Sequence, residues 1–112
     1  MSGAFLHKDL AEGRWYKMSL MEQLGNIGSE VGRARIYQEK GDEERLWKAV
    51  DRALELFDLT LSDPRWKGRL KEIGRARDVF CDATLDGKEY DSNLTDLERY
   101  FMYFAFAART FS

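Results

Sequence analysis

The sequence predicts an all-α antiparallel bundle of four long helices, preceded by a short N-terminal helix or arm. Three observations support this fold class. Apolar residues recur at spacings of three and four along four long segments, capping residues mark where these segments begin, and only short polar stretches separate them. The 112 residues contain no repeat or low-complexity tract, so we expect a single bundle domain.

The composition limits the kinds of partner. Apolar residues make up 44% of the chain and charged residues 34%, with a formal net charge of −2. This balance argues against binding nucleic acid or an anionic membrane through bulk charge. The longest apolar run, Tyr100–Ala108, is about half as long as a membrane span, and the N-terminus lacks the apolar core of a signal peptide. We therefore expect no membrane partner.

Cysteine and histidine are scarce. Cys81 is the only cysteine and cannot form an internal disulfide, so we expect a cytoplasmic location. It lies beside the apolar stripe of the third predicted helix, which favours a buried thiol over a nucleophile. His7 is the only histidine, so a Cys–His or Ser–His pair would have to use it. A zinc site has too few ligands, and we expect neither a metal nor a cofactor.

The N-terminal residues 1–18 are expected to form the short helix or arm. The segment Ala4–Ala11 fits a helix that ends at Gly13, and the aromatic residues Trp15 and Tyr16 follow it. We expect these two rings to cover the bundle rather than to bind a ligand.

The first long helix is predicted over residues 19–40. Ser19 and Glu22 have the spacing of a capping box, in which each side chain satisfies an unpaired N–H of the first helical turn. Gly41 fits the C-terminal end of this helix. Its apolar stripe consists of Leu20, Leu24, Ile27, Val31 and Ala34.

Three glycines form a second line beside that stripe, at Gly25, Gly28 and Gly32. Each glycine inside a helix costs about 1 kcal/mol relative to alanine. A neighbouring helix packed very close against the glycine line would offset this cost. We therefore predict close helix packing at these three positions.

The second helix is predicted over residues 43–62. Asp42 fits its N-cap, and acidic residues follow in the first turn, as the helix dipole favours. Its broad apolar face consists of Leu46, Val50, Ala53, Leu54, Phe57 and Leu61.

The third helix is predicted over residues 65–85. Pro64 is the only proline and can open this helix at its first position, with Asp63 as the cap. Asp86 and Gly87 are expected to end it. Its inward residues are Trp66, Leu70, Ile73, Ala76, Phe80 and Ala83 or Thr84.

The fourth helix is predicted over residues 95–111, with Thr95 and Glu98 as a second capping box. Its main apolar stripe consists of Leu94, Leu97, Phe101, Phe104, Ala108 and Phe111. Further apolar residues cover its other faces, namely Tyr100, Met102, Tyr103 and Phe106. A helix that is apolar all round is buried all round, so we expect it to lie centrally or against a second subunit.

Several short stretches resemble a family of small, uncharacterised, all-helical prokaryotic proteins. These stretches are Arg14-Trp15, Met18-Ser19-Leu20, Glu22-Gln23-Leu24, Asn26–Val31 and Arg52–Leu56. The resemblance covers most of the chain and is densest over residues 14–34. It implies a compact helical bundle and supplies no catalytic residues.

The polar face of the first helix is the main candidate site. Its residues are Glu22, Gln23, Asn26, Ser29, Glu30 and Arg33. Such a ladder can simply support an exposed helix face through i,i+4 contacts. Because it runs beside the glycine line, three further roles are open: a structural hydrogen-bond network, recognition of a partner, or a small-ligand site. We favour the structural network.

Acidic residues of the second and third helices offer an alternative, a magnesium-dependent nucleotide hydrolase. The candidate ligands are Glu55, Asp58, Asp78 and Asp82. A hairpin that turns near Pro64 would instead place Asp51 near Arg77, and Asp58 near Arg69 or Lys71. The sequence therefore favours salt bridges at the rim of the bundle over a metal site.

Basic residues of the third helix offer another alternative, association with nucleic acid. They are Arg65, Lys67, Arg69, Lys71, Arg75 and Arg77, and they could contact phosphates. They spread around the helix rather than forming one stripe, so we favour a solvated, salt-bridged face.

These observations together predict a non-catalytic helical module that acts through protein–protein contact. The excess apolar surface of the last helix and the glycine line favour a homodimer. An enzyme is the less favoured reading.

Overall fold

A computed structural model describes residues 13–85 and 87–111 of the chain. The elements are η3 (Trp15–Lys17), α1 (Leu20–Lys40), α2 (Glu43–Leu61), η4 (Pro64–Arg69), α3 (Leu70–Leu85) and α4 (Leu94–Phe111). This part of the chain contains four α-helices and no strand, so the predicted all-α class is confirmed. The predicted helix at Ala4–Ala11, and with it His7, lies outside the described residues, as does Asp86.

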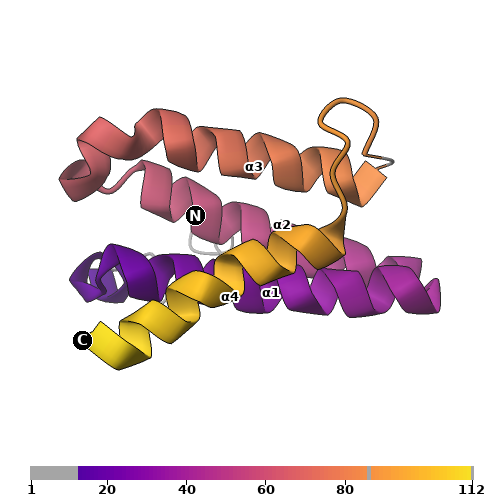
Figure 1. Cartoon of the computed structure of the whole chain (residues 1–112), viewed down its shortest axis with the longest axis horizontal. Helices are drawn as coiled ribbons and strands as arrows, with labels where there is room; N and C mark the ends of the chain where they lie inside the picture. The colour runs from indigo at the N-terminus through magenta and orange to yellow at the C-terminus, as the bar shows by residue number, and fades with distance from the viewer. Residues whose placement is uncertain (1–12, 86, 112) are drawn as a thin grey trace.

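Helix α1 runs along the lower part of the view in Figure 1, below α2 and behind α4. It packs against α2 on one side and against α4 on the other. Helix α3 runs back along α2, and α4 crosses α1 in the foreground of the view. As residue numbers rise along α1 from Gly25 to Gly32, the facing residues of α4 fall from Ala105 to Glu98, so the two helices are antiparallel.

The caps predicted at both ends of α1 and at the start of α2 are present in the structure. The hydroxyl of Ser19 accepts a hydrogen bond from the Glu22 N–H (3.1 Å), and Glu22 Oε1 accepts one from the Ser19 N–H (3.0 Å). This capping box is therefore present. Gly41 adopts the left-handed conformation that ends a helix (φ 70°). Asp42 Oδ1 then accepts a hydrogen bond from the Arg45 N–H (3.1 Å) and caps α2.

The third helix begins five residues later than predicted. Asp63 caps the helix that Pro64 opens, as expected, by accepting a hydrogen bond from the Arg65 N–H (3.0 Å). However, residues 64–69 form the 3₁₀ helix η4, and α3 starts only at Leu70. Within η4, Trp66 has non-helical dihedral angles (φ −102°, ψ 22°). Its indole Nε1–H donates a hydrogen bond to Gln23 Oε1 of α1 (2.9 Å). A tertiary contact thus overrides the local preference for an α-helix.

This longer connection shifts the register of α2 against α3. The Arg77 guanidinium pairs with Asp58 (3.0 Å), so the predictions that Arg77 faces Asp51 and that Asp58 faces Arg69 or Lys71 were wrong. The reason is physical: η4 uses six residues to make the turn that we assigned to Pro64 alone. Opposite charges still face each other across the hairpin, but Arg77 meets α2 seven residues, or about two turns, beyond the expected Asp51.

The start of α4 also differs from the prediction. Asn93 Oδ1 accepts a hydrogen bond from the Asp96 N–H (2.8 Å), and Asn93 Nδ2 donates one to Asp96 Oδ2 (3.0 Å). This pair caps α4 in place of Thr95 and Glu98. The Glu98 carboxylate instead pairs with Arg35 of α1, and this contact between helices removes it from the predicted capping box.

The core centres on large aromatic side chains that are completely buried, namely Trp15, Phe57, Phe80 and Phe101. The ring centroid of Phe57 lies 5.9 Å from that of Phe80 and 5.8 Å from that of Phe101, so α2, α3 and α4 meet at Phe57. The Trp15 indole closes one end of this core by donating a hydrogen bond to Thr60 Oγ1 (3.0 Å).

Candidate functional site

The predicted polar face of α1 divides into exposed and buried side chains. Glu22, Asn26 and Ser29 are exposed. Asn26 Nδ2 donates to the Glu22 carbonyl (2.8 Å), and the Ser29 hydroxyl donates to the Gly25 carbonyl (3.4 Å). Hydrogen bonds from Ser19 hold the pKa of Glu22 below its usual value. These three residues therefore bond mainly within their own helix and border a shallow depression of 230 Å³ beside α4.

Gln23 is the centre of a buried hydrogen-bond network. Its amide Nε2 donates to the Trp15 carbonyl (2.9 Å) and to Asp63 Oδ2 (3.1 Å). Its Oε1 accepts the hydrogen bond from Trp66 described above. A completely buried amide is costly unless its polar atoms are paired. Gln23 meets that condition and joins α1 to the chain before it and to η4.

Asp63 extends this network. Arg65 holds its carboxylate in a fork, with Nη2 2.7 Å from Oδ2 and Nε 3.1 Å from Oδ1. The Arg65 guanidinium lowers the pKa of Asp63, against the opposing effect of burial, and Gln23 lowers it further. Arg65 Nη2 also donates to the Met18 carbonyl (2.7 Å). The network thus fixes the segment before α1 against the α2–α3 connection.

Glu30 belongs to a second, separate network between α1 and α2. Its Oε2 accepts a hydrogen bond from Arg52 Nε (3.0 Å), and its Oε1 accepts one from Arg33 Nη1 (2.8 Å). Glu30 is buried, whereas Arg33 is exposed. The six polar residues of α1 therefore do not share one hydrogen-bond network. Two of them, Gln23 and Glu30, act as structural hydrogen-bond centres.

The glycine line of α1 lies against α4. A Cβ added at Gly25 would be 3.0 Å from the Ala105 Cα, and one added at Gly28 would be 2.6 Å from the Phe101 Cβ. A Cβ at Gly32 would meet the Glu98 carboxylate. Because α4 of the same chain occupies this face, the glycine line does not support the predicted homodimer.

Two of the four acidic residues of the hydrolase hypothesis, Asp58 and Asp82, bind other groups of the protein. Asp58 pairs with Arg77, as described above. Asp82 is buried and accepts hydrogen bonds from the N–H groups of Glu89 and Tyr90 and from the Ser92 hydroxyl. Among residues 13–85 and 87–111, no group of three or more His, Cys, Asp or Glu residues is placed to hold a metal ion.

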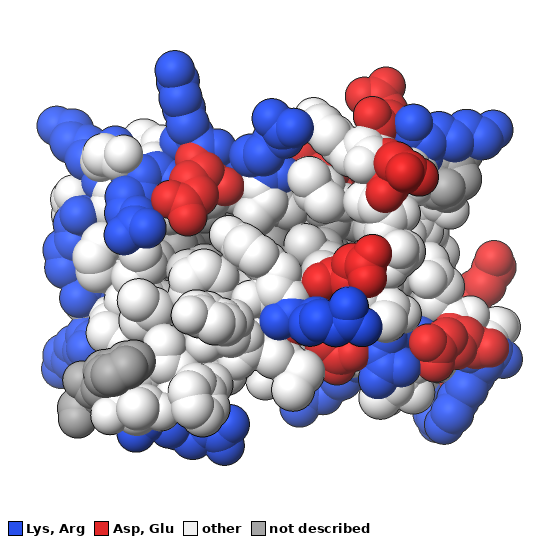
Figure 2. All heavy atoms as spheres, viewed as in Figure 1, with Lys and Arg blue, Asp and Glu red and all other residues white. Residues whose placement is uncertain are grey.

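Most arginines of the predicted basic surface are paired. Arg65 binds Asp63, Arg69 pairs with Glu72 (3.3 Å), and Arg77 pairs with Asp58. The Arg75 guanidinium lies 5.0 Å from the ring centroid of Tyr90. Figure 2 shows that basic side chains gather at the end of the molecule where η4 lies. Association with nucleic acid stays the less favoured hypothesis.

The outer face of α4 is the most unusual surface. Four large apolar side chains are exposed there: Tyr100 (43%), Met102 (61%), Tyr103 (74%) and Phe106 (61%). Of the two positions expected for α4, central within one chain or against a second subunit, the first was therefore wrong. Only its inner face packs on α1, because the bundle offers it no second neighbour of comparable size. Figure 2 shows an uncharged surface along the C-terminal half of α4.

Residues 13–85 and 87–111 form an all-α bundle in which the outer face of α4 is apolar and is covered by none of the described elements. Comparison with known protein families, curated proteins and solved structures gave no match. None of the described helices is both long and apolar enough to span a membrane.

Proposed function

We propose that this protein is a non-catalytic, cytoplasmic helical module that forms a homodimer through the outer face of α4. The supporting observation is the exposure of Tyr100, Met102, Tyr103 and Phe106 on that face. Contiguous apolar patches on protein surfaces mark interaction sites. Tyrosine, phenylalanine and methionine are also the residue types enriched at such interfaces.

The pattern along α4 supports a second copy as the partner. The nine residues Tyr100–Ala108 carry no charge, so two copies of this face meet without repulsion. Tyr103 is near the middle of the patch, with Tyr100 and Phe106 three residues to either side. In an antiparallel pair centred on Tyr103, Tyr100 of each copy therefore faces Phe106 of the other. This self-complementary arrangement is the usual form of a twofold dimer.

The test is the molecular mass in solution, measured by sedimentation or light scattering from low to high micromolar concentration. We expect a dimer for the natural sequence. The double variant Tyr103→Glu/Phe106→Glu places two charges at the centre of the interface, and we expect it to weaken dimerisation at least about tenfold. Its helical content should be unchanged, because both side chains point away from the core.

The matched control is Trp47→Glu on α2, which places a charge on another exposed aromatic residue (43% exposed). This variant should dimerise like the natural sequence. A natural sequence that is monomeric at high micromolar concentration would overturn the proposal. A double variant that remains fully dimeric would also overturn it, because dimerisation would then use another surface.

A further inference from the structure

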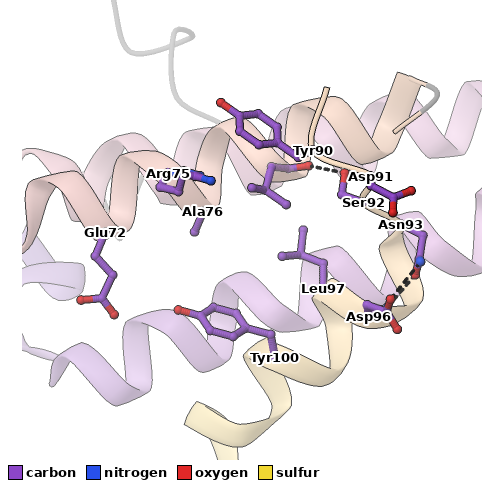
Figure 3. Close-up of a pocket in the computed structure, with 11 residues that line it drawn as sticks. Glu72, Arg75, Ala76, Tyr90, Asp91, Ser92, Asn93, Asp96, Leu97 and Tyr100 are labelled. Carbon is purple, nitrogen blue, oxygen red and sulfur yellow. Dashed lines mark hydrogen bonds between the residues drawn. The ribbon is translucent and has the colours of Figure 1, made fainter. Parts of the chain in front are cut away.

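A cavity of about 400 Å³ lies between α3, the loop that follows it, and the first turns of α4. Ala76 and Val79 of α3 and Leu97 of α4 give it an apolar lining, and Tyr90 and Tyr100 contribute aromatic rings. Figure 3 shows Ala76 and Leu97 pointing into the space between the two helices, with Glu72 near Tyr100 at one end. This volume matches a small organic molecule.

Asp82 holds the loop beside this cavity in place. Its Oδ1 accepts the Glu89 N–H (3.0 Å), and its Oδ2 accepts both the Tyr90 N–H (3.0 Å) and the Ser92 hydroxyl (2.8 Å). Burial raises the pKa of Asp82, but these three hydrogen bonds outweigh it and leave the pKa below its usual value. These hydrogen bonds hold Glu89, Tyr90 and Ser92 against the end of α3, and a site held in place by its own chain loses less entropy on binding.

The lining of the cavity itself carries more acidic than basic groups. Three carboxylates line the cavity (Glu72, Asp91 and Asp96), against one guanidinium, that of Arg75. Arg75 is stacked over Tyr90 on the α3 side. Two arginines outside the lining contact the acids: Arg69 lies 3.3 Å from Glu72 and Arg99 lies 3.6 Å from Asp96. Both pairs are at least half exposed, so solvent screens them.

One wall combines a carboxylate with an aromatic ring. Asp96 and Tyr100 are one turn apart on α4 and line the cavity on the side opposite Arg75. Burial raises the pKa of Tyr100, and the Glu72 carboxylate raises it further, against the opposing effect of Arg69. The phenol is therefore neutral at physiological pH. A neutral ring beside a carboxylate is a favourable environment for an ammonium group.

We propose that this cavity binds a small organic amine, with the ammonium group between Asp96 and Tyr100 and a compact apolar body on Ala76, Val79 and Leu97. The size of the cavity, its apolar lining and the charge of its α4 wall together select this chemical class. A single copy of the chain forms the cavity, although Tyr100 borders both the cavity and the proposed dimer interface.

The test uses three probes of nearly equal size: phenethylamine, the neutral phenethyl alcohol and the anionic phenylacetate. Binding is followed by NMR through the amide signals of Tyr90, Ser92 and Leu97. We expect phenethylamine to bind about tenfold more tightly than the alcohol, and phenylacetate to bind most weakly. Equal affinity for the amine and the alcohol, or no binding of the amine at millimolar concentration, would overturn the proposal.

Two variants locate the site. Ala76→Phe fills the cavity and should reduce amine affinity at least about tenfold, whereas Lys71→Phe, an exposed position of α3 outside the lining, should leave it unchanged.

Asp96→Asn keeps the size of the side chain and its capping oxygen but removes the charge, and should abolish the preference for the amine over the alcohol. Asp51→Asn, on the surface of α2, is its control.

Repeating the titration with the Tyr103→Glu/Phe106→Glu double variant separates this proposal from the homodimer. Amine binding should persist in that variant. Unchanged amine affinity in Ala76→Phe, or an unchanged preference for the amine in Asp96→Asn, would show that the amine binds elsewhere and would overturn the assignment.

Discussion

Gly28 of α1 and Gly74 of α3 are both glycines within long helices, yet their surroundings are opposite. A Cβ added at Gly28 would be 2.6 Å from the Phe101 Cβ of α4, whereas one added at Gly74 would have no neighbour within 4 Å. The cost of glycine in a helix is therefore offset by close packing at Gly28, and no packing contact offsets it at Gly74. This difference shows that α1 and α4 approach closely because the glycines of α1 have no side chains between the two helices.

The three positions of the glycine line also differ in the kind of atom that each one faces on α4. Gly25 faces the backbone of Ala105, Gly28 faces the first side-chain atom of Phe101, and Gly32 faces the far end of the Glu98 side chain. Backbone and Cβ atoms cannot move without moving the helix, whereas a carboxylate can rotate away. The tolerance of α1 to a methyl group should therefore rise from Gly28 to Gly32.

The largest effect is expected for Gly28→Ala. The new methyl group would push α4 away from α1 and disturb Phe101, which is completely buried against Phe57. Overpacking of this kind costs about 1–3 kcal/mol, and the better helix propensity of alanine returns about 1 kcal/mol. The 2.6 Å contact with the Phe101 Cβ places the cost in the upper part of this range, about 2–3 kcal/mol, so we expect a net loss of about 1–2 kcal/mol in the free energy of unfolding, measured by urea denaturation. No loss would mean that α4 does not lie as close to α1 as the structure shows.

The next effect is expected for Gly74→Ala, with the opposite sign. The methyl group meets nothing, so helix propensity and the reduced entropy of the unfolded chain act alone. We expect a gain of up to about 1 kcal/mol in the same urea experiment. A destabilised Gly74→Ala variant would show that α3 has a close neighbour at this position and would remove the contrast with Gly28.

Much of the fold could be predicted because its signals are local. The capping box at Ser19 and Glu22, the stop at Gly41 and the cap at Asp42 each depend on residues within one turn. The glycine line was informative for a related reason: three costly residues on one helix face indicate a neighbour, although the sequence could not say that the neighbour is α4 of the same chain.

The errors arose where distant residues decide the local structure. Trp66 leaves the helical conformation while bonded to Gln23, and no pattern near residue 66 predicts that contact. Glu98 had the spacing of a capping residue but pairs with Arg35 across the bundle. The cavity beside Tyr90 was missed entirely, because Asp82 shapes that loop through hydrogen bonds to residues seven to ten positions away.

The smallest effect is expected for Gly32→Ala. The methyl group would displace the Glu98 carboxylate and weaken its partly buried ion pair with Arg35. Such a pair contributes up to about 1 kcal/mol, which is close to the helix-propensity gain of alanine. We therefore expect the free energy of unfolding to change by less than about 0.5 kcal/mol.

A double-mutant cycle separates the two contributions at Gly32. In a Glu98→Ala background the carboxylate is absent, so Gly32→Ala should now stabilise the protein by nearly the full propensity difference of about 1 kcal/mol. The same background should not rescue Gly28→Ala, because Phe101 rather than Glu98 blocks that position. If Gly32→Ala stays neutral without Glu98, the backbone of α4, and not its side chain, limits the approach of the two helices along the whole glycine line.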